Sequence, residues 1–255
     1  MTSNTVTMIA VGIDCTSGRQ AFTYAALDRD LRVITIAEVD LESVLSFLGD
    51  QASAHVAVNS PSHLNTGVVR KRLQSQQTSP HAVRGAEIRE AEYELHLRGL
   101  PVGGTPRSEA LCSAWIQLGF ELYQRLEPLH YSPYPSEDSP RQWIETHPHA
   151  GFCALLGRAP LPKPTLEGRL QRALALFERG VRIHDPMGFL EEITRHRLLN
   201  GLLPMEQVLA QEQLDALLAA YTAWLTAFKP ADVSQLGNRQ EGFITLPVSH
   251  LNQKY

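Results

Sequence analysis

Three acidic residues stand at positions where a carboxylate could perform chemistry. Asp14 closes the apolar segment 8–15, and Glu145 ends a second apolar segment that begins at residue 142. Asp215 stands within a long apolar helical segment. A carboxylate at the end of a buried strand costs on the order of several kcal/mol unless it is paired or binds a metal ion. Carboxylates that converge can hold the divalent ions of two-metal phosphodiester hydrolysis, and oxygen ligands favour magnesium or manganese.

Two of these acids also have a purely structural interpretation. Asp14 could accept hydrogen bonds from the backbone amides of Thr16 and Ser17 in a turn, a common use of aspartate. Asp215 is a poor helix former, and we therefore expect it on the exposed side of its helix. Spacing by itself leaves both interpretations open, because acids are common at the strand ends of α/β proteins.

Two histidines follow Glu145 in the chain and offer a different metal. In an extended segment Glu145, His147 and His149 share one face, so Glu-x-His-x-His could bind zinc. Pro148 distorts such a strand, and a tetrahedral zinc site needs a third or fourth protein ligand that the sequence does not identify. We keep zinc as the weaker alternative.

The composition is that of a soluble globular protein of one large or two small domains. The 255 residues are 43% hydrophobic and carry a net charge of -4, so a nucleic-acid partner would need a local basic patch. The three cysteines have no CxxC spacing, which disfavours a disulfide framework. No apolar run approaches the ~20 residues of a membrane span, and the N-terminal MTSNTV lacks a basic signal-peptide start. We expect a cytoplasmic protein without a membrane segment.

The first quarter of the chain predicts a sheet. Strands are expected at 8–15, 20–28 and 32–39, and their short connections predict an antiparallel meander. A helix from Asp40 or Leu41 to Leu48 and a strand at 54–59 follow. This order places the ends of the first and fourth strands side by side in a mixed sheet, where open α/β sheets bind their ligands.

The rest of the chain predicts mostly helices. Residues 62–82 are polar and we expect an irregular surface excursion there, while the proline-rich residues 128–140 form a loop. A fifth strand is expected at 142–146, and 242–246 predicts a short final strand. Helices are expected at 86–97, 106–126, 150–156, 165–179, 189–199 and 206–228.

Several segments resemble known families. The first strand with GIDCTSG is similar to the ribonuclease H-like superfamily. Other segments resemble an uncharacterised family within it, the predicted nucleases also labelled domain of unknown function 429. The matching segments are VGIDCTSG (11–18), VAVNSP (56–61), REAEYELHLRGL with the later TP (89–106), IETHPHAGFCALLG (144–157), LPKPTLEGRLQRAL (161–174), LDALLAAYTAWL (214–225) and EGFITLP (241–247).

The resemblance implies a fold and a catalytic centre. The fold is a single ribonuclease H-like domain over residues 1–255, with an insertion at about 62–140. Its mixed five-stranded sheet combines the three-strand meander with parallel strands, and helices flank it. The implied activity is metal-dependent hydrolysis of nucleic acid, in which Asp14, Glu145 and Asp215 are catalytic and hold Mg²⁺ or Mn²⁺.

Further polar residues match the family's motifs and are implied to line the same cleft as substrate-binding groups. One of them departs from the pattern, because Asn59 stands at the end of the fourth strand where the family usually has an acid. An asparagine oxygen can bind a metal but adds no negative charge, which weakens the affinity for divalent ions. The substrate-binding residues are Asn59, Arg89, Glu92, Lys163 and Arg172, and Glu241 matches a further polar position.

Two other functions compete with a nuclease. Asn59 and the absence of a basic surface favour a catalytically inactive module that binds nucleic acid or protein. Sugar kinases and actin-like ATPases also begin with a strand, an aspartate and a Gly/Thr/Ser turn. The second half of the chain has no further Asp-Gly-Thr segment and no Gly-Gly adenosine motif, so the ATPase ranks last. The sequence leaves the oligomeric state open.

Overall fold

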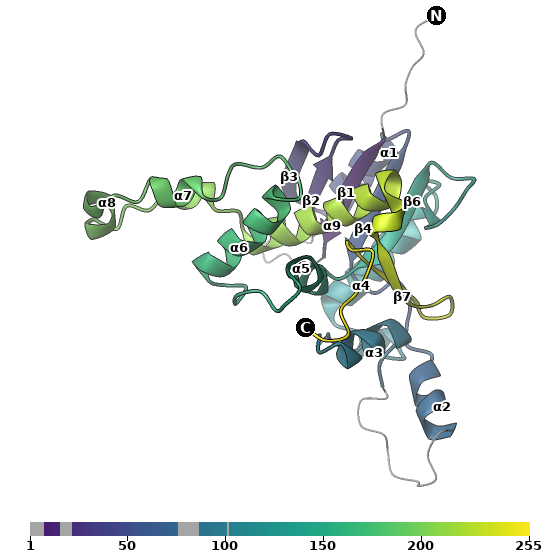
Figure 1. Cartoon of the computed structure of the whole chain (residues 1–255). Helices are drawn as coiled ribbons and strands as arrows, with labels where there is room; N and C mark the ends of the chain where they lie inside the picture. The colour runs from purple at the N-terminus through teal and green to yellow at the C-terminus, as the bar shows by residue number, and fades with distance from the viewer. Residues whose placement is uncertain (1–7, 16–21, 76–86, 101) are drawn as a thin grey trace, which may run out of the picture.

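A mixed β-sheet forms the centre of the protein (Figure 1). The computed structural model describes residues 8–15, 22–75, 87–100 and 102–255. The expected meander is confirmed, because β1–β2 and β2–β3 pair antiparallel, and β4 and β6 continue the sheet parallel to β1. In the described residues the strand order is β3-β2-β1-β4-β6-β8-β7, with β5 beside β6. The strands are β1 Ile9–Asp14, β2 Phe22–Leu27, β3 Val33–Val39, β4 Ala54–Asn59, β5 Ser132–Pro133, β6 Arg141–Thr146, β7 Ser234–Asn238 and β8 Gly242–Leu246.

The described sheet has eight strands, so the expected count of five was wrong. The sequence does indicate β8, but β5 and β7 carry no usable pattern. β5 is two residues long within the proline-rich loop, and β7 has the polar sequence SQLGN. β7 forms because it pairs antiparallel with β8 in a hairpin, and such tertiary pairing is invisible to a test for alternating apolar residues.

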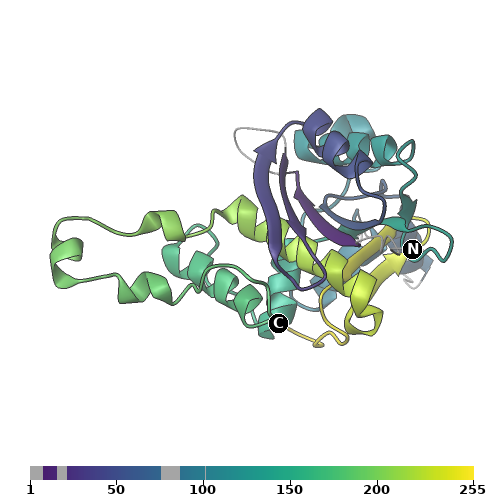
Figure 2. The ribbon, with the colours of Figure 1, turned by 90° about the horizontal axis from the view of Figure 1, so that it is seen from above.

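Helices cover both faces of the sheet, as expected for an α/β protein. α9 (Gln211–Phe228) crosses one face, and α1 (Leu41–Gly49) and α4 (Ala114–Leu126) cover the other (Figures 1 and 2). None of the helices among the described residues has the length and apolar character to span a membrane. The remaining helices are α2 Val68–Ser75, α3 Glu90–Leu97, α5 Pro148–Leu156, α6 Leu166–Phe177, α7 Gly188–Glu191 and α8 Arg195–Leu199.

Two long predicted helices begin later than expected. α4 begins at Ala114 rather than residue 106, because a 3₁₀ turn at Glu109–Leu111 and the extended backbone of Ser113 precede it. α9 begins at Gln211 rather than residue 206, because residue 206 belongs to another 3₁₀ turn and Gln213 accepts a hydrogen bond from the Ala210 amide. In both cases local hydrogen bonds replace the first predicted turn.

Two further segments differ from their predictions. Part of the polar excursion at 62–82 is helical, since it contains α2, whose Val69 is buried. The helix expected at 189–199 is two short helices, α7 and α8, separated at Thr194, whose hydroxyl caps α8 by accepting from the Arg197 amide. α7 ends at Glu191 and the N-cap threonine starts a new helix, which the apolar periodicity does not reveal.

The sheet and α9 approach each other very closely at Gly12 of β1. A Cβ atom at Gly12 would lie 2.0 Å from the carbonyl oxygen of Ala216 and 2.1 Å from the backbone nitrogen of Ala220, both in α9. The contacting residues of α9 are small, including Ala219, so the helix backbone can lie directly against β1. This contact fixes where the side chains of the first turns of α9 lie relative to the end of β1.

We predict that Gly12→Ala lowers the free energy of unfolding by about 3 kcal/mol or more, because the new methyl group forces α9 away from β1. Urea unfolding followed by circular dichroism measures the change. The control is Gly103→Ala, where a Cβ meets no atom within 4 Å. Equal stability losses in the two variants would contradict the close packing at Gly12.

Candidate functional site

Asp14 and Asn59 lie side by side at the carboxyl ends of two parallel strands. The register of β1 and β4 pairs them directly, so their side chains leave the sheet on the same face. The Asn59 Nδ2 donates to the Asp14 Oδ1 at 2.6 Å. Asp14 is buried, and Thr16 and Ser17, whose amides form the alternative turn, lie outside the described residues.

Asp215 of α9 lies beside Asp14, and the prediction that Asp215 would be exposed was wrong. Only 4% of Asp215 is exposed, because every residue of α9 from Leu214 to Thr226 is buried. The helix lies so close to Gly12 that even its polar residues are covered by the sheet. Burial, together with the negative charge of Asp14, raises the pKa of Asp215 to about 6 against the opposing effect of Lys163. The structure therefore brings the Asp14 and Asp215 carboxylates together.

Lys163 supplies the positive charge beside these acids. Its ammonium group forms an ion pair with the Asp215 carboxylate, and its side chain stays 37% exposed. Lys163 stands in the loop before α6, whose first turn is capped by Thr165 accepting from the Gly168 amide. We call Asp14, Asn59, Lys163 and Asp215 the carboxylate pair site.

Arg172 stabilises the loop that carries Lys163. The side chain is buried on α6, and its Nη1 donates to the carbonyls of Leu161 at 2.9 Å and Gly168 at 2.8 Å. Its guanidinium also lies over the Phe152 ring at 5.5 Å. These bonds hold the loop that carries Lys163, so Arg172 positions the lysine.

Glu145 does not join the carboxylate pair site. Its strand neighbour in the register is Val58, which packs in the core beneath α1 and α4. Side chains alternate between the two faces of a strand, so Glu145 leaves the sheet on the face opposite to Asp14 and Asn59. By the same alternation Thr146 points to their face, where its hydroxyl donates to the backbone of β8. The assignment of Glu145 as a catalytic metal ligand remains a prediction without geometric support.

Glu145 instead belongs to a second buried network built on Arg89. The Arg89 guanidinium donates to both carboxylate oxygens of Glu145. The same carboxylate accepts from the Ser62 amide at 2.7 Å and from the Ser62 hydroxyl at 2.8 Å. The Arg89 Nε donates to Glu92 at 2.8 Å, and Thr105 also donates to Glu92. Arg89 is 1% exposed. We call Arg89, Glu92 and Glu145 with their hydroxyl partners the Arg89 network.

Glu241 extends the Arg89 network to the hairpin of β7 and β8. Its backbone carbonyl accepts from Arg89, and its carboxylate accepts from the amides of Glu90 and Thr66, both at 2.8 Å. Burial opposes ionisation of Glu241, but these hydrogen bonds outweigh it and lower the pKa. Arg89, Glu92 and Glu241 therefore join these segments, and the assignment of Arg89 and Glu92 as substrate-binding residues stays a prediction.

The two histidines occupy a helix start rather than a strand. Pro148 is the first residue of α5, and His147 caps the helix by accepting from the Ala150 amide at its Nδ1, 3.2 Å away. Burial, with the neighbouring His149, lowers the pKa of His147 to about 4, so the ring is neutral. The shared strand face required for zinc is therefore absent, and the His-Pro pair itself was the overlooked signal of a helix N-terminus.

The carboxylate pair site offers oxygen atoms of the kind that hard cations bind, but it lacks the third carboxylate of a two-metal centre. Asp14 and Asp215 offer carboxylate oxygens, and Asn59 offers an amide oxygen if its amide turns. The third carboxylate of a two-metal centre, Glu145, points to the other face. Throughout the described residues no group of three or more His, Cys, Asp or Glu side chains could hold a metal ion.

A comparison with family models matches residues 12–232 to a family described as protein of unknown function, DUF429. The chain belongs to the DUF429 family. No curated protein and no solved structure matches significantly. The DUF429 match includes the whole carboxylate pair site but ends before β7 and β8, so Glu241 of the Arg89 network lies beyond it.

We predict that Arg89→Met lowers the free energy of unfolding by about 3–5 kcal/mol, because it leaves buried carboxylates without their countercharge. Urea unfolding provides the measurement. The control is Arg125→Met, since Arg125 pairs with Glu42 on the surface and such pairs contribute about 0–1 kcal/mol. A loss below about 1 kcal/mol for Arg89→Met would show that the network is not the interaction that joins these segments.

The raised pKa of Asp215 predicts how the free energy of unfolding varies with pH. The folded pKa is about 6 and the unfolded pKa is near the ordinary 3.8, so the folded state takes up a proton first as the pH falls. Wild type should therefore gain stability relative to Asp215→Asn between pH 7 and pH 4, by on the order of 2 kcal/mol. Urea unfolding of both proteins across this range tests it, with the exposed Asp30→Asn as control. A stability difference between wild type and Asp215→Asn that does not vary with pH would contradict the raised pKa of the buried Asp215 carboxyl group.

Proposed function

We propose that this protein is a metal-dependent phosphodiesterase of ribonuclease H-like fold that hydrolyses nucleic acid at the carboxylate pair site. The observation that carries the proposal is the convergence of two buried carboxylates, Asp14 and Asp215, from β1 and α9. They meet at the carboxyl ends of parallel strands, where open α/β sheets place their ligands. The meander followed by parallel strands also agrees with the ribonuclease H-like order.

Electrostatics supports a cation at this site. Two neighbouring carboxylates repel each other in a buried setting, and burial with the charge of Asp14 raises the pKa of Asp215. Asp14 and Asp215 would hold one Mg²⁺ or Mn²⁺, with the Asn59 amide oxygen as a neutral third ligand. The bound ion would activate water and polarise the phosphate.

Lys163 is the substrate-binding residue that this geometry favours. Its side chain is partly exposed while its ammonium group reaches the acids. If an ion replaces it at Asp215, its ammonium group is free to neutralise a phosphate oxygen. Arg172, also expected to bind substrate, would act by positioning the Lys163 loop, since its own guanidinium donates to Leu161 and Gly168.

One observation favours the inactive binding module as the second candidate. Asn59 donates to Asp14 and Lys163 donates to Asp215, so each carboxylate has a protein partner without any ion. Such pairs can stabilise a buried site that performs no chemistry.

The test combines manganese calorimetry with a cleavage assay on single- and double-stranded DNA and RNA. Wild type should bind Mn²⁺ and cleave, and Asp14→Asn or Asp215→Asn should lower cleavage at least ~100-fold, more than the loss of an outer-shell partner costs. Lys163→Met should bind Mn²⁺ more tightly at pH 8, because the competing ammonium group is gone. Binding should weaken below pH 6, where Asp215 takes up a proton.

The exposed variant Asp30→Asn is the matched control and should change neither binding nor cleavage. If the folded wild-type protein neither binds Mn²⁺ in the presence of nucleic acid nor cleaves that nucleic acid, the proposal of a phosphodiesterase is overturned. Salt-sensitive binding of nucleic acid without cleavage would then identify the binding module.

A further inference from the structure

A pocket of about 340 Å³ opens beside β6, where the sheet changes from one neighbouring strand to another. In the described sheet β5 pairs with β6 at Gln142 and Trp143. β8 pairs with β6 further along, at Glu145 and Thr146, while β4 occupies the other edge. The end of β5 and the start of β8 therefore leave a gap, and its volume lies in the range of small-molecule sites, roughly 300–1,000 Å³. We call it the β6–β8 pocket.

Aromatic side chains from three segments line the β6–β8 pocket. Tyr134 follows β5, Trp143 lies in β6 and Phe243 lies in β8. Tyr134 and Trp143 already contact other aromatic rings, whereas Phe243 has no such contact among the described residues and is partly exposed. The residue opposite Phe243 in β7 is Gly237, so β7 places no side chain beside the ring. A planar ligand can therefore stack on Phe243.

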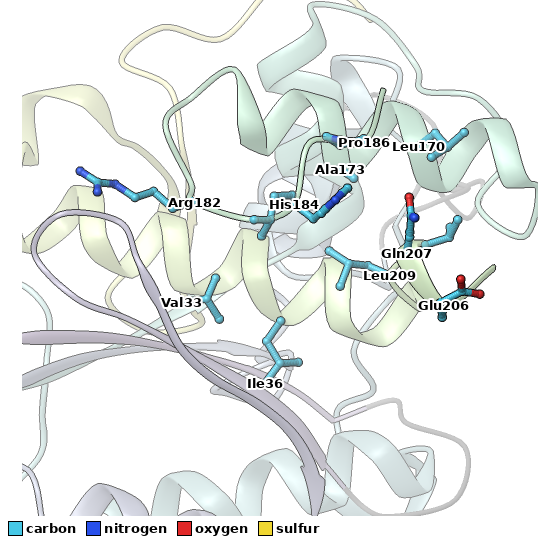
Figure 3. A pocket seen from close by; sticks show the side chains of 12 residues that line it. Val33, Ile36, Leu170, Ala173, Arg182, His184, Pro186, Glu206, Gln207 and Leu209 are labelled. Carbon is cyan, nitrogen blue, oxygen red and sulfur yellow. The ribbon is translucent and has the colours of Figure 1, made fainter. Parts of the chain in front are cut away.

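A second pocket of similar size, about 370 Å³, has a different character (Figure 3). It lies between β3 and α6, where Val33, Ile36, Leu170 and Ala173 form apolar walls. Its described lining contains no Phe, Tyr or Trp. Aromatic walls therefore distinguish the β6–β8 pocket as the place for a planar ring.

Arg239 gives the β6–β8 pocket a positive charge. It lies in the turn between β7 and β8, is exposed, and forms no ion pair among the described residues. The other charged residue of the lining is Glu145, which is already paired with Arg89. A guanidinium group pairs well with phosphate and carboxylate groups. The charge of the lining therefore favours an anionic ligand.

His63 supplies a hydrogen-bond acceptor to the same pocket. The Ser62 hydroxyl donates its one proton to Glu145 at 2.8 Å, so the 2.9 Å bond between Ser62 Oγ and His63 Nδ1 uses the imidazole proton. Desolvation lowers the pKa of His63 against the opposing charge of Glu145, so at pH 7 the ring is neutral and Nε2 accepts. Gln235 and Thr245 add polar atoms to the lining. A heterocycle with polar edges fits these groups better than a hydrocarbon ring.

We propose that the β6–β8 pocket binds a nucleoside monophosphate, whose base stacks on Phe243 and donates an N–H to His63 while its phosphate pairs with Arg239. The hairpin brings these groups together. A Cβ at Gly242 would lie 3.0 Å from the His63 Nδ1, and Gly242 directly precedes Phe243. A nucleic-acid strand requires a positively charged groove, whereas this lining has one unpaired arginine, so the ligand is a free nucleotide.

The β6–β8 pocket is separate from the carboxylate pair site, since none of that site's four residues lines it. Calorimetric titration with AMP and GMP in the presence of EDTA therefore tests this proposal without the metal ion that the proposed cleavage needs. Wild type should bind at least one of them with a dissociation constant below about 1 mM. A failed cleavage assay does not change this expectation.

Two variants test which groups hold the nucleotide. Arg239→Gln should weaken nucleotide binding ~10-fold or more, as expected for the loss of a charged hydrogen bond. It should leave adenosine, which has no phosphate, unaffected. Phe243→Ala should weaken both nucleotide and adenosine ~10-fold, the loss expected for a stacked base. The control Arg158→Gln, at an exposed arginine outside the pocket, should bind as wild type does.

Three results would overturn the proposal. The first is a folded wild-type protein that binds neither AMP nor GMP. The second is nucleotide binding that neither Arg239→Gln nor Phe243→Ala weakens, because the ligand would then occupy another place. The third is binding of a single-stranded oligonucleotide without binding of either mononucleotide.

Discussion

The contact of α9 with β1 at Gly12 is the constraint on which the candidate site depends. Because glycine has no side chain, the backbone of Ala216 approaches to a distance that any Cβ atom would prevent. Asp215, one residue earlier in α9, is carried into the protein at the end of β1. Its burial and its proximity to Asp14 are consequences of this backbone packing, and the raised pKa follows from both.

The sheet separates the buried charges into two groups with different roles. On one face, Asp14 and Asp215 lie together at the strand ends, where burial and the charge of Asp14 raise the pKa of Asp215. On the other face, Arg89 and its hydroxyl-bearing neighbours donate hydrogen bonds to Glu145 and Glu92. The second arrangement joins the loop after β4, α3, β6 and the β7–β8 hairpin into one unit. Proximity of acids is therefore not enough to identify a site.

The projecting arm at residues 184–207, which contains α7 and α8, poses a different physical problem from the core. The sheet and its helices bury their apolar residues within one chain, but the leucines of α8 lie beyond the reach of their own core. Val33, Ile36, Leu170 and Ala173 line an apolar pocket where this arm joins the body.

The sequence by itself determined the order of the main strands and the positions of Asp14 and Asn59 at strand ends. Short connections and apolar runs are local, so the meander, β4 and β6 could be predicted from residue types alone. The sequence could not assign Glu145 to a face, because a shift of one residue in register reverses the direction of every side chain. It placed Asp215 on the exposed side because helix propensity is local, whereas burial depends on the sheet lying against the helix. The short strands β5 and β7, the pairing of Arg89 with Glu145 and the projection of the arm were likewise decided by tertiary contacts, since each joins segments far apart in the chain.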